Sequence, residues 1–575
     1  MKKILLTVSL GLMMTIGVHA QGDDIIRVNQ VGFYPQQEKV AVIEQTSKKT
    51  KVVITNAETG KKVGTAQFVR ISESPWSKKK RMVVDFSNIT TPGRYVLECK
   101  GHKMPFEVKE HALTSITAGA INSFYLNRSG IALVEQYAGQ WARPAGHLDT
   151  EVMIHPSAAS PGRPAGAIIS SPFGWYDAGD YNKYIVNSAY SVGIMLCAYE
   201  QNKAYFDQLS VDIPEQNNET ADLLDELMYN LKWMLTMQDP YDGGVYHKLT
   251  TPAFEAMVMP SDCHQQRYVV QKSVTASYDF AAVMAQAARI FKGNKDYPDF
   301  APDAARAALA AYHWAEQHPR AFYSQRAMNE HFDPDVSTGE YGDGNAIDER
   351  YWAATELFLL TDDPVFHAAA EQTQPEHFGV PSWGNIASLG VFDWMQCPSD
   401  PLAEKCRELL INFSNQALAT LPTSGFNTPS GNDPRNFGWG CLAETFCAQG
   451  MTMLYAYKLT GDKRYLAAAQ HNVDYVLGRN ATGYCYVTGF GQKSPMHPHH
   501  RLSTADGIDV PCPGMLVGGP NPGQQDRHET GVVYASSEPD ESYCDTMPSY
   551  ASNEIAINWN AALVGVLGWL DAIAP

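Results

Sequence analysis

The chain changes its pattern of apolar and polar residues once, near Ser115. Between residues 25 and 108, short runs rich in Val, Ile, Phe and Tyr, such as KVAVIEQ and RMVVDFSN, alternate with turn-forming stretches at residues 56–60 and 91–93. Such runs, broken by Gly, Pro and Asn, are typical of strands joined by tight turns. About six or seven strands in so short a stretch predict a small β-sandwich over residues 24–108.

After Ser115, apolar residues recur with the spacing of one helical face. In TADLLDELMYNLKWMLTMQDP, for example, Leu223, Leu227, Leu231 and Met234 lie on one side of a helix. About eleven or twelve such segments follow, separated by long polar loops of the kind that is usually functional. They predict an all-α domain over residues 112–575, built as a toroid of helix pairs. A helical solenoid is the alternative, although no fixed repeat supports it.

The first residues indicate export. Lys2 and Lys3 precede an apolar run at residues 4–18, and the small-residue motif that ends at Ala20 predicts removal of a signal peptide, residues 1–20. No later apolar run is long enough to cross a bilayer, and no cysteine follows the cleavage site to hold a lipid. We expect a protein that is periplasmic or secreted, without a membrane anchor.

The composition narrows the classes of partner. A net charge of -18 argues against nucleic acid and against anionic membranes, both of which attract Lys and Arg. Aromatic residues make up 11% of the chain, which fits either a large core or stacking platforms for sugar rings. The ten cysteines show no paired spacing, so we predict no disulfide and expect most of them to be buried.

Three carboxylates stand out as candidate chemistry. Asp177 and Asp180 lie three residues apart in GWYDAGDYNKY, where Lys183 is positioned in sequence to keep them charged. Glu554 comes just before the last apolar helix, either as an acid that complements the helix dipole or as a proton donor whose pKa is raised by apolar surroundings. Glycoside hydrolysis needs an acid on one side of the sugar and a base or nucleophile on the other. Two aspartates on one loop are suited to gripping a single water.

These motifs resemble those of glycoside hydrolase family 9, inverting β-1,4-glucanases with an (α/α)6 barrel, and most of all the subgroup with an N-terminal immunoglobulin-like domain. DAGDYNKY resembles the family's aspartate loop, which implies Asp180 as the catalytic base and Asp177 as its water-holding partner. The segment from Tyr543 resembles the C-terminal signature, which implies Glu554 as the general acid. The matching positions there are Tyr543, Asp545, Tyr550, Glu554, Ala556, Asn560 and Ala561.

The same resemblance implies a set of substrate-binding residues. GGVYHK is similar to a loop with a substrate-contacting histidine, NFGWGC to a segment whose tryptophan stacks on a sugar, and PHHR to a motif that contacts sugar hydroxyls. For each aromatic residue, simple core packing is the alternative. The implied residues are His247, Trp439, His499, Arg501, Tyr543, Asp545 and Trp559.

Metal ions call for separate predictions. STGEYGDGNAIDER resembles a family calcium loop and offers the oxygen ligands that calcium prefers, from Thr338, Asp343, Asp348 and Glu349; the alternative is a polar loop with a helix cap. Relatives often carry a structural zinc on a cysteine and histidine before the aspartate loop. Here Gly146 replaces the cysteine before His147, so we predict that the zinc site is absent.

We therefore expect a β-glucan hydrolase that needs no cofactor for its chemistry. It would cleave β-1,4-glucosidic bonds with inversion, in cellulose-like, mixed-linkage or xyloglucan chains, and act within the chain. Two alternatives stay open. The same fold supports an exo-acting β-glucosidase or glucosaminidase, and it also supports a glycan-binding protein without catalysis.

Overall fold

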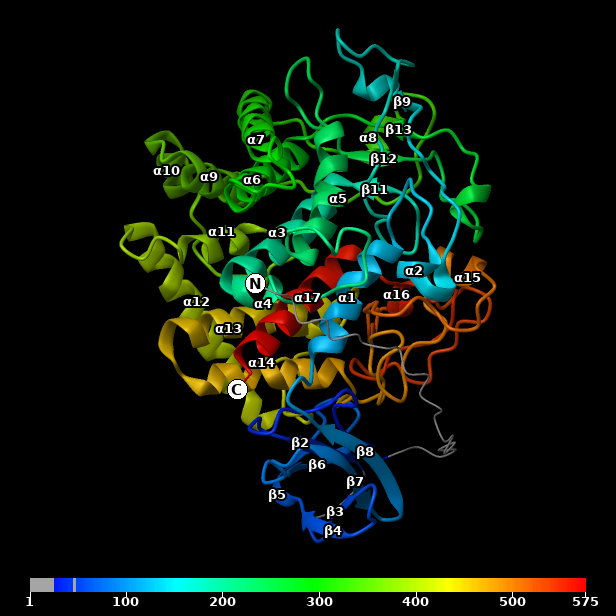
Figure 1. Ribbon diagram of the computed structural model, residues 1–575, viewed down its shortest axis with the longest axis vertical. Helices are drawn as coiled ribbons and strands as arrows, with labels where there is room; N and C mark the ends of the chain where they lie inside the picture. Colours follow the sequence, from blue (N-terminus) through cyan, green and yellow to red (C-terminus); the bar gives the residue numbers. More distant parts are fainter. Residues whose placement is uncertain (1–24, 45–47, 575) are drawn as a thin grey trace.

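The computed structural model describes residues 25–44 and 48–574, and shows a small β-rich part at one end of a larger helical body (Figure 1). The predicted signal peptide, residues 1–20, lies outside the described residues. Among the helices that the structure describes, none is both long and apolar enough to cross a membrane.

The β-rich part is the predicted sandwich. Its two four-stranded sheets have the orders β1-β2-β6-β5 and β4-β3-β7-β8, and all named pairings are antiparallel. Side chains such as Ile43, Val84 and Leu97 are buried between the sheets. The strands are β1 (Ile26–Arg27), β2 (Val40–Glu44), β3 (Val53–Asn56), β4 (Lys62–Thr65), β5 (Gln67–Glu73), β6 (Lys80–Asp85), β7 (Gly93–Cys99) and β8 (His102–Val108).

The helical body alternates inner and outer helices along the chain. The inner helices are buried over most of their length, because both their faces meet other helices. They are α3 (Ile185–Gln201), α6 (Val274–Ile290), α9 (Ile347–Thr361), α11 (Ala387–Trp394), α13 (Gln449–Thr460) and α17 (Ile557–Ile573). The outer helices are α1 (Thr114–Leu126), α5 (Asp222–Thr236), α7 (Phe300–Gln317), α10 (Pro364–Thr373), α12 (Pro401–Thr420) and α14 (Lys463–Val476).

The inner helices close into a ring. Helix α17 packs on α3, α3 on α6, α6 on α9 and α9 on α11. Between α11 and α13, Phe392 stacks on Tyr455 with ring centroids 4.0 Å apart, and Tyr455 contacts Trp569 of α17 at 4.7 Å. A solenoid would leave its first and last helices apart, whereas here the last helix contacts the early ones. The predicted toroid is confirmed as an (α/α)6 barrel.

A small sheet over the barrel was not predicted. It has the order β10-β9-β13-β12-β11, and its strands have two or three residues each, too few for a recognisable alternation of apolar and polar positions. Strand β11 directly follows the aspartate loop, so the sheet anchors that loop. The strands are β9 (Val152–Ile154), β10 (Ile168–Ile169), β11 (Lys183–Tyr184), β12 (Lys248–Thr250) and β13 (Tyr268–Val269).

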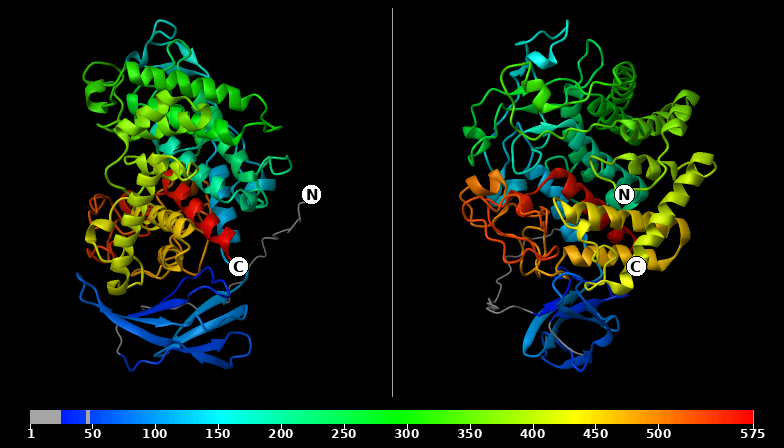
Figure 2. Two further views of the ribbon diagram at one scale, coloured as in Figure 1. Left: turned by 90° about the vertical axis from the view of Figure 1, so that its left-hand side faces the viewer. Right: turned by 180° about the vertical axis from the view of Figure 1, so that it is seen from behind.

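The sandwich lies against the loops of the barrel domain that lead to Glu554 (Figure 2). Arg81 of β6 is 2% exposed and pairs with Asp540 at 2.8 Å. The indole of Trp76 donates to the same carboxylate at 2.6 Å, and Lys79 pairs with Glu541 at 2.7 Å. The sandwich is therefore attached to the barrel domain through a buried ion pair between Arg81 and Asp540.

Candidate active site

Two glycines allow the aspartate loop to reach its position. Gly174 has φ +84°, and a Cβ there would lie 2.8 Å from the Trp233 ring. Gly179 packs still more tightly, since a Cβ would lie 2.4 Å from the backbone oxygen of His499 and 3.0 Å from Oε1 of Glu554. The Gly179 N–H donates to that same Oε1 at 3.2 Å. The glycine between the two aspartates therefore brings their loop against Glu554.

Asp177 is held from both sides. Its Oδ1 accepts a hydrogen bond from Asn187 of α3 at 2.7 Å, and its Oδ2 accepts one from the Tyr341 hydroxyl at 2.7 Å. Burial and the charge of Asp180 raise the pKa of Asp177 to about 8, against the opposing effect of these two donors. The charge of Asp180 thus disfavours a second negative charge on Asp177.

Asp180 has one fixed oxygen and one open oxygen. Its Oδ2 accepts hydrogen bonds from the Asn182 side chain at 2.6 Å and from the Tyr184 hydroxyl at 3.1 Å. Its Oδ1 accepts none from any described residue. A carboxylate oriented in this way can present Oδ1 to a water molecule.

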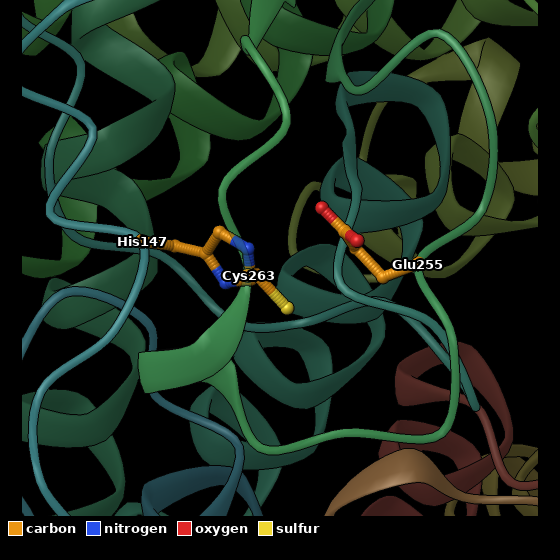
Figure 3. Close-up of side chains that lie close together, drawn as sticks. All are labelled: His147, Glu255 and Cys263. Atoms are coloured by element: carbon orange, nitrogen blue, oxygen red, sulfur yellow. The ribbon is translucent and has the colours of Figure 1, made fainter.

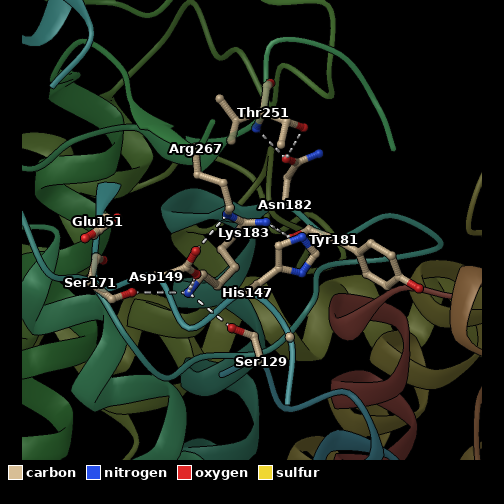
Figure 4. A network of polar contacts seen from close by, with 12 residues as sticks. Ser129, His147, Asp149, Glu151, Ser171, Tyr181, Asn182, Lys183, Thr251 and Arg267 are labelled. Carbon is tan, nitrogen blue, oxygen red and sulfur yellow. Dashed lines mark hydrogen bonds and ion pairs between the residues drawn. The ribbon is translucent and has the colours of Figure 1, made fainter. Parts of the chain in front are cut away.

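The cation that acts on Asp180 is Lys248, not Lys183. Residues 183 and 184 are adjacent in a strand, so their side chains point to opposite faces, and Tyr184 takes the face toward Asp180. Lys183 instead pairs with buried Asp149 at 2.7 Å (Figure 4). It also donates to the Phe173 carbonyl at 2.7 Å. The expectation that Lys183 keeps the catalytic aspartates charged is wrong.

Lys248 is fully buried on β12. Burial lowers its pKa to about 7, and the charges of Asp180 and Glu340 oppose that shift. Its Nζ donates to Gln325, to the Thr338 hydroxyl at 3.0 Å and to the Gly339 carbonyl at 2.7 Å. The family resemblance pointed to His247 in this loop and gave no role to the neighbouring Lys248, so Lys248 was not predicted.

Glu554 does not begin a helix. It follows the short helix α16 (Tyr550–Asn553) in an extended segment, where it pairs with His499 as an isolated bridge, and α17 begins only at Ile557. Burial raises its pKa to about 8, aided by Asp180 and Asp177 and opposed by the Gly179 N–H and Arg501. The reading as a helix-dipole acid is therefore wrong, and the carboxyl is protonated at neutral pH, as a proton donor requires.

The PHHR segment holds the three carboxylates together. Arg501, which opens the short helix α15 (Arg501–Ala505), donates through Nη1 to the Gly179 carbonyl at 2.7 Å and through Nε to the Glu255 carbonyl at 2.9 Å. His499 donates from Nδ1 to the Met547 carbonyl at 2.8 Å, which leaves its Nε2 free of any described partner. Its half-buried ring lies near enough to feel the charge of Asp180.

Tyr543 and Asp545 support the loop that carries PHHR. Asp545 accepts from the backbone N–H groups of Met496 and His497 at 2.9 to 3.1 Å and from the Asn553 amide at 3.1 Å. The buried Tyr543 hydroxyl donates to the side-chain oxygen Oδ1 of Asn553 at 2.6 Å. Both groups are occupied by protein partners in this structure.

The predicted aromatic and histidine contacts lie at different depths. Trp439 is 46% exposed, with its ring 5.8 Å from Tyr550, so it offers a face to a sugar. Trp559 is 5% exposed and packs against Gly440, where a Cβ would lie 2.3 Å from its Nε1. His247 is fully buried, and its two ring nitrogens lie 2.9 Å from the Ser273 hydroxyl and 2.8 Å from the Glu340 carbonyl.

A second aromatic pair was missed in the sequence. The Tyr341 ring lies 5.1 Å from the Trp383 ring, and Tyr341 is the residue that donates to Asp177. The rings of Tyr341 and Trp383 therefore lie beside the aspartate pair. The rings of Trp439 and Tyr550 lie beside the His499 segment. Tyr341 sits in a polar loop and Trp383 in a turn, where no periodic pattern marks them.

Buried carboxylates gather near the predicted calcium loop. Asp279 of α6 and Glu349 of α9 are both fully buried, and none of their four oxygens has a partner among the described residues. Their pKa values are raised by burial and by the charges of Asp343 and Asp348. Thr338 is not in this group, since its hydroxyl contacts Lys248 and Thr250. Sequence reasoning missed Asp279 because it lies in an apolar helix far from the loop.

The space in front of His147 explains the glycine that precedes it. A Cβ on Gly146 would lie 2.3 Å from the backbone of Pro260. The segment from residue 251 to 267 fills the place of any side chain at that position. A cysteine at position 146 would therefore fit only if Pro260 moved.

The arrangement gathers one protonated acid and one oriented carboxylate pair. Glu554 can give a proton to a leaving oxygen, and Asp180 can accept one from a water that Asp177 helps to hold. The two sites are joined through Gly179 and Arg501, so their spacing is fixed by the backbone.

Comparisons with known proteins point the same way. Residues 114–567 match glycosyl hydrolase family 9, and residues 21–104 match the cellulase N-terminal Ig-like domain. A xyloglucan-specific endo-β-1,4-glucanase from Bacteroides ovatus is 52% identical over 96% of this chain and 94% of its own. Endoglucanase D from Acetivibrio thermocellus is 32% identical over 96% of this chain and 85% of its own.

Solved structures agree in fold. A Bacteroides ovatus GH9 structure superposes with a TM-score of 0.91 at 51% identity, covering 96% of this chain and all of that one. A thermostable endoglucanase from Alicyclobacillus acidocaldarius superposes with a TM-score of 0.84 at 29% identity, covering 95% of this chain and 99% of that one.

Proposed function

The chain belongs to glycosyl hydrolase family 9 and is an endo-β-1,4-glucanase, and we propose that xyloglucan is its preferred substrate and that it acts with inversion. The contact that carries the mechanism is the Gly179 N–H on Glu554, because it fixes the acid against the aspartate loop. The substrate preference rests on the relative that is 52% identical and named as xyloglucan-specific.

In the proposed reaction, Glu554 protonates the glycosidic oxygen as the bond to the anomeric carbon breaks. Asp180 takes a proton from the water that attacks the opposite face of the sugar, and Asp177 orients that water. The pKa of about 8 for Glu554 keeps its proton in place at neutral pH. One attack from the opposite face gives a product of inverted configuration.

Aromatic rings support binding of a chain that extends past the cleavage point. Trp439 and Tyr550 lie beside the His499 segment, while Tyr341 and Trp383 lie beside Asp177. Rings on two sides of the carboxylates suit a polymer held in mid-chain, since sugar faces stack on aromatic faces.

Initial rates on xyloglucan, mixed-linkage β-glucan and soluble cellulose derivatives test the substrate. We expect the highest kcat/KM on xyloglucan, with oligosaccharides of mixed length at early times. Equal rates on unbranched glucans would contradict the preference. A single short product from the start would favour the exo-acting alternative, and binding without hydrolysis would favour the non-catalytic one.

We also propose that the buried carboxylates hold a structural calcium ion. Asp279 and Glu349 carry four unpartnered oxygens, and Asp343 and Asp348 lie near enough to act on their pKa values. Burying so much negative charge is costly unless a cation compensates it. The ion would tie α6 to α9 and take no part in the chemistry. A lower thermal midpoint after chelation, restored by calcium, is expected; no change would contradict it.

Export is proposed from residues 1–20. The basic start, the apolar run and the small-residue motif at Ala20 support it. The mature protein should begin at Gln21, which intact mass of the processed chain tests. Retention of residues 1–20 would contradict the proposal.

A further inference from the structure

Three metal-binding side chains that the proposed reaction does not use come together beside the aspartate loop. His147, Glu255 and Cys263 each offer one ligand atom, and these atoms all lie within 4.8 Å of one another. His147 precedes the aspartate loop in sequence, while the other two belong to the segment from residue 251 to 267. Figure 3 shows the imidazole, the thiol and the carboxylate side by side, facing a common space.

Two of the three side chains have a polar atom without a partner among the described residues. Nε2 of His147 and Oε1 of Glu255 are buried and make no hydrogen bond to any described residue. A buried polar atom left unpaired costs free energy, so such atoms call for an explanation. Among the described residues, the Cys263 thiol has one long hydrogen-bond contact, from Sγ to the Met259 carbonyl at 3.6 Å.

The surroundings of His147 fix which nitrogen is available. Nδ1 lies 3.0 Å from the Tyr176 hydroxyl, which lies 3.5 Å from the Gly146 carbonyl. A proton on Nδ1 can be donated to Tyr176, and Nε2 then carries the lone pair. A histidine that binds a metal characteristically donates its other N–H in this way.

We propose that His147, Glu255 and Cys263 bind a zinc ion, which clips the segment from residue 251 to 267 to the aspartate loop. An imidazole, a carboxylate and a thiolate match the nitrogen, oxygen and sulfur donors that zinc takes, with water in the fourth position. Binding releases the thiol proton, so one thiolate and one carboxylate balance the dication. His147 is also the histidine of the family's zinc motif, but Glu255 and Cys263 come from a segment after the aspartate loop, so the set of donors differs from the one that Gly146 removes.

The clip would act on the active site through short contacts. The Glu255 carbonyl accepts from Arg501 at 2.9 Å, and Arg501 also holds the Gly179 carbonyl. The Tyr181 hydroxyl of the aspartate loop donates to the Val258 carbonyl at 2.7 Å. A metal at these three residues would stabilise a segment that already contacts Arg501 and Tyr181.

Zinc content of the full chain tests the proposal. Protein exposed to zinc and then dialysed should hold about one zinc ion per chain, measured by elemental analysis, and its thermal midpoint should rise. Cys263→Ser should lose the ion. The matched control is Cys397→Ser, since both thiols are free and half-buried, and it should keep the ion. Equal zinc in wild type and Cys263→Ser would overturn the site.

Titration with Co²⁺ tests the same site in the wild-type protein, so the result does not depend on whether a variant folds. Wild-type protein titrated with Co²⁺ should show the near-ultraviolet thiolate-to-cobalt band at one equivalent, and added Zn²⁺ should remove it. Absence of that band in wild-type protein would overturn the proposal. Because neither measurement uses glucan hydrolysis, the result is independent of the proposed function.

Discussion

Replacing Gly179 with alanine tests whether the backbone sets the distance between acid and base. The new Cβ would lie 2.4 Å from the His499 oxygen, whereas ordinary contacts begin at 3.4 Å, so the two segments must separate by about 1 Å. Neither neighbour is a flexible side-chain end, because one is backbone and the other is the catalytic carboxylate. The hydrogen bond that the N–H of residue 179 donates to Glu554 would lengthen as the two segments separate.

A misplacement of about 1 Å can cost roughly a hundredfold in rate, or about 2.7 kcal/mol of transition-state stabilisation. We expect Gly179→Ala to lower kcat on xyloglucan by about that factor. Binding of an oligosaccharide should change little, because Trp439 and Tyr341 are untouched. Calorimetric binding and the thermal midpoint separate a displaced site from an unfolded one. The control Gly438→Ala adds its Cβ to open space, with no atom within 4 Å. A variant that keeps more than a third of wild-type kcat would refute the reasoning.

Three further predictions concern charged groups, two in the active site and one at the contact between the sandwich and the barrel. The pKa of about 8 for Glu554 means that the acid loses its proton above that pH, so kcat/KM should fall on the alkaline side near pH 8; constant activity to pH 10 would contradict its role. Lys248→Met removes a positive charge that interacts with Asp180, so kcat at pH 6, where Lys248 is charged, should fall below the wild-type value, while exposed Lys232→Met should keep it; equal rates in the two variants would contradict the role of Lys248. Arg81→Met leaves the buried Asp540 without its cation and should lower the free energy of unfolding in urea by about 3–5 kcal/mol. The exposed control Arg94→Met should lower it by about 1 kcal/mol or less, and similar losses in both variants would show that the Arg81–Asp540 pair is not desolvated.

Much of the fold was predictable because it rests on repeated local patterns. The alternation before residue 108 and the helical spacing after Ser115 are present in each segment, so the sandwich and the succession of helices follow from the sequence. The small sheet could not be predicted, since strands of two or three residues carry no periodic signal. Closure of the ring depends on contacts such as Phe392 with Tyr455, which are far apart in sequence.

The candidate site was predictable where a motif holds its residues together and not where folding brings them together. Asp177, Asp180 and Glu554 stand in continuous motifs. Lys248 was missed because a choice between two lysines depends on which face of a strand each occupies. Asp279 was missed because nothing in its apolar helix points to the loop at residue 343. The donors around His147 come from a loop more than a hundred residues later, so only the structure joins them.

Glu554 protonates the leaving oxygen while the aspartate pair activates one water on the opposite face of the sugar, and this division of roles requires inversion at the anomeric carbon. The most direct test is NMR of the products within the first minutes of hydrolysis, before mutarotation mixes the anomers. We expect the α-anomer to appear first from a β-linked glucan. Initial formation of the β-anomer would mean retention, and the roles assigned to Asp177 and Asp180 would then be wrong.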